Sequence, residues 1–273
     1  MQEMKTYSQV FSELAELNRA ALIPFFVIGD PDFDTSLTIV QAAIDAGADI
    51  LELGIPFSDP IADGPTIQKA DIRALRGGIN VKKGLEFIRK VKDYKDVPIG
   101  LLMYYNLVYQ YGTEKFLSDF HEAGVNSVLI ADLSIDDADE IIVPAKSAGL
   151  DTVFMVTPNT ETDRIKLIAS KTTGFIYTVS LYGVTGSRKK LSDKVEGLIR
   201  KLKGLTKVPV CVGFGISTPE HAATVASAGA DGVIIGSKIV QLIEENLGNS
   251  EKLLGEISKF IRQVKKAIGN QRV

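Results

Sequence analysis

The chain has 273 residues, 45% of them hydrophobic, a formal net charge of -3 at pH 7, and a single cysteine. This charge gives no reason to expect a nucleic-acid or anionic-membrane partner, and one cysteine excludes an internal disulfide framework. The apolar runs are too short to cross a bilayer and the amino-terminal segment is unlike a signal peptide, so we expect a cytoplasmic protein.

Short apolar runs alternate with segments of helical periodicity along the whole chain. The eight runs that predict buried strands span residues 21–29, 49–56, 97–105, 127–133, 151–157, 174–180, 208–215 and 231–237. Apolar residues recur at helical spacing between them, in residues 34–48, 81–94, 113–124, 136–149, 161–172, 194–204 and 218–229. Further helical patterns precede the first strand, at 7–18, and follow the last, at 239–246 and 251–268.

An Ala-Gly pair, starting at Ala46, Ala123, Ala148 and Ala228, marks four of the helix-to-strand junctions. Glycine suits a helix carboxyl terminus because it adopts positive φ without strain. Near-continuous apolar strands that alternate with helices predict a parallel sheet buried on both faces. Eight such units predict one (β/α)8 barrel domain over residues 1–273, with an extra amino-terminal helix and extra carboxy-terminal helices.

The active site of such a barrel lies at the carboxyl ends of its strands, so polar residues there are the candidates for catalysis. Glu52 alternates with large apolar residues in the second strand and is therefore expected to point into the barrel. A structural ion pair would need a Lys or Arg, and no strand body contains one. Asp63 follows in the next loop, where solvated acids are common, while Asp59 and Asp132 fit turn, cap or surface roles better.

Glycines gather at the ends of the last three strands: Gly183 and Gly186, Gly213 and Gly215, and Gly236 next to Ser237. A single such loop would be an ordinary tight turn. Three in adjacent loops favour a phosphate site, because glycine lets backbone N–H groups approach a phosphate and a following helix adds a favourable dipole.

The residue types at the strand ends disfavour Schiff-base chemistry and catalysis by a bound metal. No lysine lies in a strand body, which disfavours a Schiff base. His121 and His221 fall in outer helical segments, which disfavours a catalytic metal held by histidine, and no metal is expected. Cys211 lies among valines in mid-strand and is expected to be a small core residue.

Several motifs together resemble the alpha subunit of tryptophan synthase. They are LELGIPFSDPIADGPTIQ after the second strand, GLLMYYNLV at the third, GVTG after Tyr177, and GFGIS and IIGS near the end. The first is highly specific, whereas GVTG or GFGIS alone is weak. The resemblance covers essentially the whole chain.

The resemblance implies a lyase that cleaves indole-3-glycerol phosphate to indole and glyceraldehyde 3-phosphate. It implies Glu52 and Asp63 as catalytic acids with Tyr177 beside them, and Thr185 as a residue that meets Asp63 when two loops close. The indole ring would be surrounded by Phe25, Leu102, Tyr104, Leu129, Ala131, Phe214 and Val233. The phosphate would be bound by Gly186, Gly215, Gly236 and Ser237.

The residues fit this retro-aldol reaction, because indole protonated at C3 can draw electrons from the breaking bond without a metal or an imine. Glu52 is the expected proton donor, with a pKa raised by an apolar site, and Asp63 would bind the ring N–H. The rival hypotheses are another phosphate-binding barrel, such as an isomerase, an epimerase or indole-3-glycerol phosphate synthase, and a catalytically silent barrel that only binds and activates a partner.

The resemblance also implies a partner, a beta subunit that carries pyridoxal phosphate, in an alpha2beta2 complex; this chain itself is expected to bind no cofactor. The expected docking face includes Pro56, Asp59, residues 106–111 and the loop after Asp132. The segment LSIDDADE after strand four and Leu181–Tyr182 before GVTG depart from the common family pattern, which bears on partner coupling rather than on the chemistry.

Overall fold

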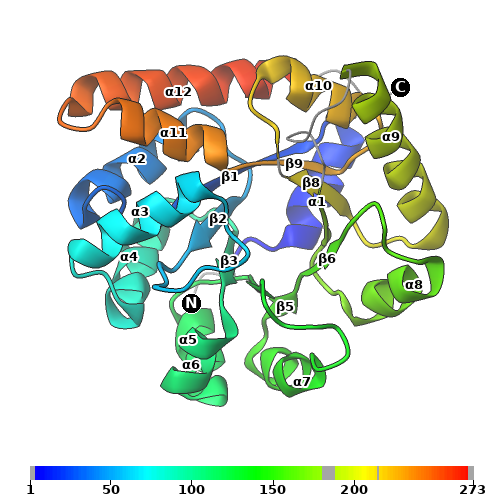
Figure 1. The fold of residues 1–273 in the computed structure, drawn as a ribbon, viewed down its shortest axis with the longest axis horizontal. Coiled ribbons are helices and arrows are strands. Elements are labelled where there is room, and N and C mark those ends of the chain that lie inside the picture. The colour runs from blue at the N-terminus through cyan, green and yellow to red at the C-terminus, as the bar shows by residue number, and fades with distance from the viewer. Residues whose placement is uncertain (1–3, 180–187, 214, 270–273) are drawn as a thin grey trace.

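A computed structural model of the chain describes residues 4–179, 188–213 and 215–269. Its strands form one parallel sheet that curls into a barrel, and the helices surround it (Figure 1). The strands are β1 (Ala21–Val27), β2 (Leu51–Gly54), β3 (Ile99–Met103), β4 (Ser127–Ile130), β5 (Asp151–Thr152), β6 (Phe154–Val156), β7 (Ile176–Val179), β8 (Val210–Gly213) and β9 (Gly232–Ile235). The helices are α1 (Tyr7–Glu16), α2 (Phe33–Asp45), α3 (Pro65–Arg76), α4 (Val81–Tyr94), α5 (Tyr105–Tyr111), α6 (Thr113–Glu122), α7 (Asp139–Ala148), α8 (Thr162–Lys171), α9 (Arg188–Leu205), α10 (Pro219–Ser227), α11 (Ser237–Glu245) and α12 (Ser250–Ala267).

The barrel closes through the fifth predicted strand, which the structure divides into β5 and β6. The sheet order is β5-β4-β3-β2-β1-β9-β8-β7-β6, so the two halves of one run stand at its two ends. Val153 lies between them, and its N–H donates to the Val128 carbonyl at 3.1 Å. β5 pairs with β4 and β6 with β7, which joins the ends. The predicted (β/α)8 barrel is therefore confirmed.

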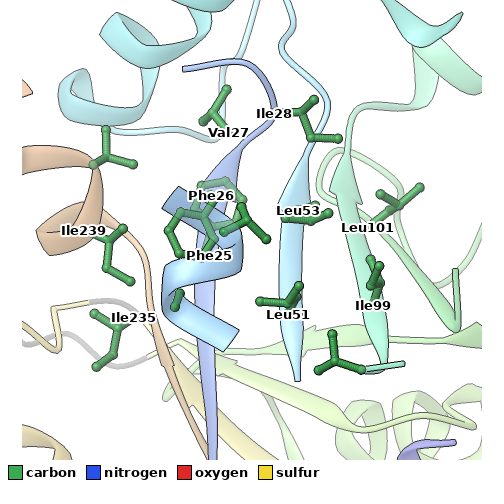
Figure 2. Close-up of a cluster of buried hydrophobic side chains, with 14 of the residues drawn as sticks. Phe25, Phe26, Val27, Ile28, Leu51, Leu53, Ile99, Leu101, Ile235 and Ile239 are labelled. Carbon is green, nitrogen blue, oxygen red and sulfur yellow. The ribbon is translucent and has the colours of Figure 1, made fainter. Parts of the chain in front are cut away.

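Alternation along the strands separates apolar residues of the barrel interior from those between the sheet and the helices. Leu51 and Leu53 of β2 belong to the outer cluster, between sheet and helices, with Leu101 of β3 and Ile235 of β9 (Figure 2). Residues one position away face the barrel interior, as Ile50 does. Because side chains of a strand point alternately to its two faces, Glu52 faces inward with Ile50. The predicted orientation of Glu52 is thus confirmed.

Helix α1 closes the amino-terminal end of the barrel, so the opposite end is left for a ligand site. Tyr7 and Phe11 of α1 pack in the interior cluster, and the Tyr7 hydroxyl lies 2.8 Å from Ser127 Oγ at the start of β4. Thr6 caps the helix, with its side chain accepting from the Gln9 N–H. The predicted extra amino-terminal helix is confirmed.

Two helices of the structure, α3 and α5, were not expected from periodicity. α3 begins with Pro65, whose missing N–H costs nothing at a helix start. Arg73 of α3 makes a two-pronged ion pair with buried Asp30, at 2.7 and 2.9 Å, which ties α3 to the end of β1. The Tyr105 N–H at the start of α5 donates to Asp132 at 2.8 Å, so Asp132 has the expected capping role.

The predicted carboxy-terminal helices are α11 and α12, and α12 packs on α2 and α10 (Figure 1). Its buried stripe, Leu253, Ile257, Ile261 and Val264, has the three- and four-residue spacing of an amphipathic helix. None of the helices in the described ranges is long and apolar enough to cross a membrane.

Candidate active site

A cavity of about 190 Å³ opens at the carboxyl ends of the strands, where the fold class places active sites. Residues from β1, β2, β3, β7 and β9, from the loops after β2 and β8, and from α3 and α11 contribute to it. The described residues that line the cavity are Phe25, Glu52, Asp63, Gly64, Ile67, Leu102, Tyr177, Gly215, Ile216, Ser217, Ile234, Gly236, Ser237 and Lys238. The structure therefore brings Glu52, Asp63 and Tyr177 together with one apolar wall and one glycine-rich end.

Glu52 is the deepest acid of the cavity and is only 4% exposed. Its Oε2 atom is buried without a hydrogen-bond partner among the described residues. Burial raises the pKa of Glu52 to about 8, and the nearby charge of Asp63 adds to the effect. Glu52 is therefore protonated at neutral pH, which equips it to donate a proton.

Asp63 enters the cavity from the loop after β2 and is held there by Tyr104. The Tyr104 hydroxyl donates to Asp63 Oδ2 at 2.7 Å and accepts from the Ala62 N–H at 3.0 Å. Burial raises the pKa of Asp63, while the hydrogen bond from Tyr104 opposes the rise. Asp63 is half-buried, so its second oxygen has access to the cavity that it lines.

Tyr177 stands on β7 beside Cys211 of β8, with which it pairs in register. The ring packs against the Cα of Gly213, where any side chain would collide with the Tyr177 hydroxyl. Burial raises the pKa of Tyr177, and Glu52 and Asp63 raise it further. Tyr177 is thus a neutral hydroxyl next to both acids.

The apolar wall of the cavity comes from Phe25, Ile67, Leu102, Ile216 and Ile234. Phe25 fits there because Gly54 and Gly236 leave room for its ring: a Cβ at Gly54 would lie 2.9 Å from Phe25 Cζ, and one at Gly236 would lie 3.2 Å from Cδ1. These two glycines therefore set the position of the ring that forms one side of the cavity.

Four residues expected around an indole ring lie elsewhere than in the lining. Val233 was assigned to the wrong face: it packs in the outer cluster, fully buried, and its neighbour Ile234 faces the cavity. Tyr104 contacts Asp63 instead of lining the cavity. Leu129 and Ala131 lie in or against the interior cluster, and Leu129 lines a separate cavity of about 200 Å³ that Arg164 also borders.

The glycine-rich end of the cavity is formed by Gly215, Gly236 and Ser237. Gly215 has φ of +76°, a conformation that favours glycine. α11 begins at Ser237, and no side chain caps it at Gly236. The Ile239 N–H donates to the Gly236 carbonyl at 2.8 Å, so the N–H groups of Ser237 and Lys238, with the positive dipole end of the helix, are the ones available to an anion. The predicted residues Thr185, Gly186 and Phe214 lie outside the described residues, as does Gly183.

Several cavity residues were not singled out from the sequence. Ile234 faces inward because it pairs in register with Ile23 of β1, an interior residue, whereas Val233 pairs with Leu22 of the outer cluster. Residues 233–235 are all apolar, so the sequence does not distinguish the two faces there. Ile67 and Gly64 belong to the start of α3, a helix whose pattern was missed. Lys238 follows directly after the IIGS motif, and its charge beside a predicted phosphate site was a usable signal.

Comparison with protein families gives one description for nearly the whole chain. The family model described as Tryptophan synthase alpha chain matches residues 11–269. A relative of that name from Methanoregula boonei is 44% identical over 259 residues, which is 95% of this chain and 98% of the relative. Another, from Methanothermobacter thermautotrophicus, is 44% identical over 97% of both chains.

Solved structures with the same fold agree with this description. The alpha subunit of tryptophan synthase from Legionella pneumophila superposes with a TM-score of 0.90 at 32% identity, covering 98% of this chain and 100% of that one. A chain from the Pyrococcus furiosus structure described as a tryptophan synthase a2b2 complex superposes with a TM-score of 0.84 at 38% identity, covering 91% and 98%.

Proposed function

The chain belongs to the tryptophan synthase alpha chain family, and we propose that it cleaves indole-3-glycerol phosphate to indole and glyceraldehyde 3-phosphate with Glu52 as the acid. Membership makes it an enzyme of tryptophan biosynthesis. The observation that carries the proposed mechanism is the buried, uncharged Glu52 whose Oε2 lacks a described hydrogen-bond partner in the cavity.

Glu52 protonates indole C3 in this mechanism. The bond between C3 and the side chain then breaks, and its electron pair neutralises the cationic indole ring. The hydroxyl on the departing carbon becomes an aldehyde and loses its proton to the Glu52 carboxylate, which restores the acid. One carboxyl with a raised pKa thus serves both proton transfers.

Asp63 accepts the indole N–H and stabilises the positive charge that develops on the ring. The hydrogen bond from Tyr104 leaves one carboxylate oxygen of Asp63 for this role. Preorganised acceptors of this kind act where charge appears in the transition state. Tyr177, which lines the cavity together with both acids, orients the substrate side chain.

The indole ring occupies the apolar wall, with Phe25, Leu102 and Ile234 against it. The phosphate is bound at the opposite end by backbone N–H groups of Gly186, Gly215, Gly236 and Ser237. Support for this end comes from the uncapped start of α11 and the positive φ of Gly215.

This chain also forms an alpha2beta2 complex with a beta chain that carries pyridoxal phosphate, while it binds no cofactor itself. The a2b2 complex of the Pyrococcus furiosus relative supports this. Exposed apolar side chains stand on the carboxyl-terminal face of the barrel, where docking is expected: Ile61 is 83% exposed and Tyr109 is 63% exposed. Ile61 lies two residues after the expected docking residue Asp59, and Tyr109 lies within the expected docking segment 106–111.

The decisive experiment measures indole release from indole-3-glycerol phosphate by the wild-type chain and by Glu52→Gln, alone and with the cognate beta chain. Gln keeps the size of Glu and cannot donate the proton, so turnover should fall by about 10²–10⁴-fold. Unchanged circular dichroism and unchanged glycerol 3-phosphate binding would show that the variant is folded. No turnover by wild type, with or without the partner, would favour the catalytically silent barrel.

A further inference from the structure

Lys238 carries the positive charge of the cavity. It is the second residue of α11, is half-buried, and lines the same cavity as Glu52 and Asp63. Among the described lining residues it is the only lysine or arginine, and the two carboxylic acids of the lining are Glu52 and Asp63. An anion that enters this cavity would meet two carboxyl groups and one ammonium.

The Lys238 ammonium has no carboxylate partner within salt-bridge distance in the described ranges. Its Nζ lies 3.4 Å from Oε1 of Gln241, one turn further along α11, which is a long hydrogen bond to a neutral group. Lys69 of α3 differs, because its ammonium is paired with Glu244 of α11 at 2.9 Å. If the Lys238 side chain turns toward a bound anion, it gives up only this weak hydrogen bond to Gln241.

Two further observations indicate that an anion binds beside Lys238. The start of α11 has no side-chain cap at Gly236, and the Ile239 N–H donates to the Gly236 carbonyl, which leaves the N–H groups of Ser237 and Lys238 for a ligand. The same cavity contains the unpartnered, buried Oε2 of Glu52, which indicates that a ligand completes the site. Backbone N–H groups supply only partial positive charge, whereas a phosphate dianion carries two negative charges and enters a cavity that Asp63 also lines.

We propose that Lys238 is a substrate-binding residue that pairs with the phosphate group of the substrate and selects for phosphorylated ligands. This inference rests on the proposed function, since the phosphate is that of the proposed substrate. The backbone of Gly236 and Ser237 fixes the position of the phosphate, and Lys238 adds a charge-assisted hydrogen bond and compensates the repulsion from Asp63. Lys238 takes no part in bond cleavage.

The test compares wild type with Lys238→Met, Lys238→Arg and Lys259→Met. Met keeps the length and helix propensity of Lys, Arg keeps the charge, and Lys259 is an exposed lysine of α12 outside the cavity. Dissociation constants of glycerol 3-phosphate and of indole are measured at low and high ionic strength, together with kcat and KM for indole-3-glycerol phosphate.

Lys238→Met should weaken glycerol 3-phosphate binding by about five- to thirtyfold, the size of one charge-assisted hydrogen bond reduced for a half-exposed group. Indole binding and kcat should stay at wild-type values, and KM should rise by the same factor. The salt dependence of phosphate binding should flatten in Lys238→Met, while Lys238→Arg and Lys259→Met behave as wild type.

Wild-type affinity of Lys238→Met for glycerol 3-phosphate at low ionic strength would overturn the inference. Equal losses for indole and for glycerol 3-phosphate would also overturn it, because they would indicate general damage to the cavity. Failure of the proposed function is distinct from both outcomes: there, the wild-type protein would release no indole from indole-3-glycerol phosphate.

Discussion

The Tyr104 hydroxyl donates a hydrogen bond to Asp63 at 2.7 Å and accepts one from the Ala62 N–H. Tyr104 directly follows β3, so this strand fixes the loop after β2 that brings Asp63 to the cavity. Tyr104 also stacks on Phe57, with ring centroids 5.1 Å apart and planes 26° apart. Phe57 belongs to the same loop, before Asp63. Tyr104 therefore contacts the loop on both sides of its turn.

Tyr104→Phe should lower turnover more than it lowers stability. The ring and its stacking on Phe57 are kept, while the hydrogen bonds to Asp63 and Ala62 are lost. Loss of a hydrogen bond to a charged group costs about 1.5–3 kcal/mol, or roughly 10- to 100-fold in kcat/KM if it acts in the transition state. Steady-state kinetics and thermal unfolding of the variant check this. Unchanged kcat/KM would show that Asp63 needs no support from Tyr104.

The neighbours Ile234 and Val233 offer a matched pair of substitutions. Both are almost fully buried in β9, but Ile234 lines the cavity and Val233 packs against the helices. Ile234→Ala should raise KM and weaken indole binding, by about 1–3 kcal/mol for lost apolar contact. Val233→Ala should lower stability and leave indole binding unchanged. Isothermal titration with indole separates them, and weaker indole binding in Val233→Ala alone would restore the assignment of Val233 to the ring.

Asp71 of α3 supports the same loop from the other side. It is buried, and it accepts a hydrogen bond from the Phe57 N–H. Burial raises its pKa to about 8, with nearby Asp63 and Asp30 adding to the rise. Asp71→Asn keeps a neutral acceptor and should retain near wild-type turnover at pH 6–7. Asp71→Ala leaves the N–H without that partner and should lower kcat by about three- to tenfold.

The pH dependence distinguishes a positioning role of Asp71 from a purely structural one. Above its pKa, Asp71 becomes a second negative charge near Asp63, so wild-type turnover should fall there more steeply than that of Asp71→Asn. Rate profiles between pH 6 and 9 for the two proteins check this. Superimposable profiles, or equal activity of Asp71→Asn and Asp71→Ala, would reject the role.

The raised pKa of Glu52 predicts a pH-dependent stability difference between wild type and Glu52→Gln. The folded pKa is about 8 and the ordinary value is 4.5, so between these the unfolded chain releases a proton that the folded chain keeps. Wild-type stability from this group is fully present below pH 4.5 and is lost as pH rises toward 8. The free energy of unfolding of Glu52→Gln should therefore rise relative to that of wild type as pH increases through this window, by at most about 1.4 kcal/mol per unit of pKa difference. Urea unfolding at pH 5, 6.5 and 8 measures it; parallel curves for the two proteins would contradict the prediction.

The inward orientation of Glu52 could be predicted from the sequence because it depends on the alternation of residues along one strand. Glu52 could be placed inside the barrel since its apolar neighbours at Leu51 and Leu53 occupy the helix-facing side. The same rule gives no answer in β9, because Val233 and Ile234 are both apolar and only pairing with β1 shows which of them faces inward. The division of the fifth strand at Val153 had no local signal, because it reflects which neighbour each half pairs with.

The helix α3 shows why other features could not be predicted. Its buried side includes Asp71 and its stability draws on the Arg73 ion pair with Asp30, residues that a search for apolar periodicity counts as exposed. The contact between Tyr104 and Asp63 likewise joins residues 41 positions apart. Such contacts arise only when the barrel brings separate loops together, so no local pattern records them.

The protonation state of Glu52 is the central claim of the proposed mechanism, and its pKa is directly measurable. Carboxyl-carbon NMR of protein labelled with ¹³C at glutamate side chains, recorded from pH 4 to 10, follows each glutamate, and the Glu52→Gln spectrum identifies the signal of Glu52. A midpoint near 8 is predicted, with the carboxyl protonated at neutral pH. A midpoint near the ordinary value of 4.5 would mean that Glu52 is ionised at neutral pH, and would contradict its role as the proton donor.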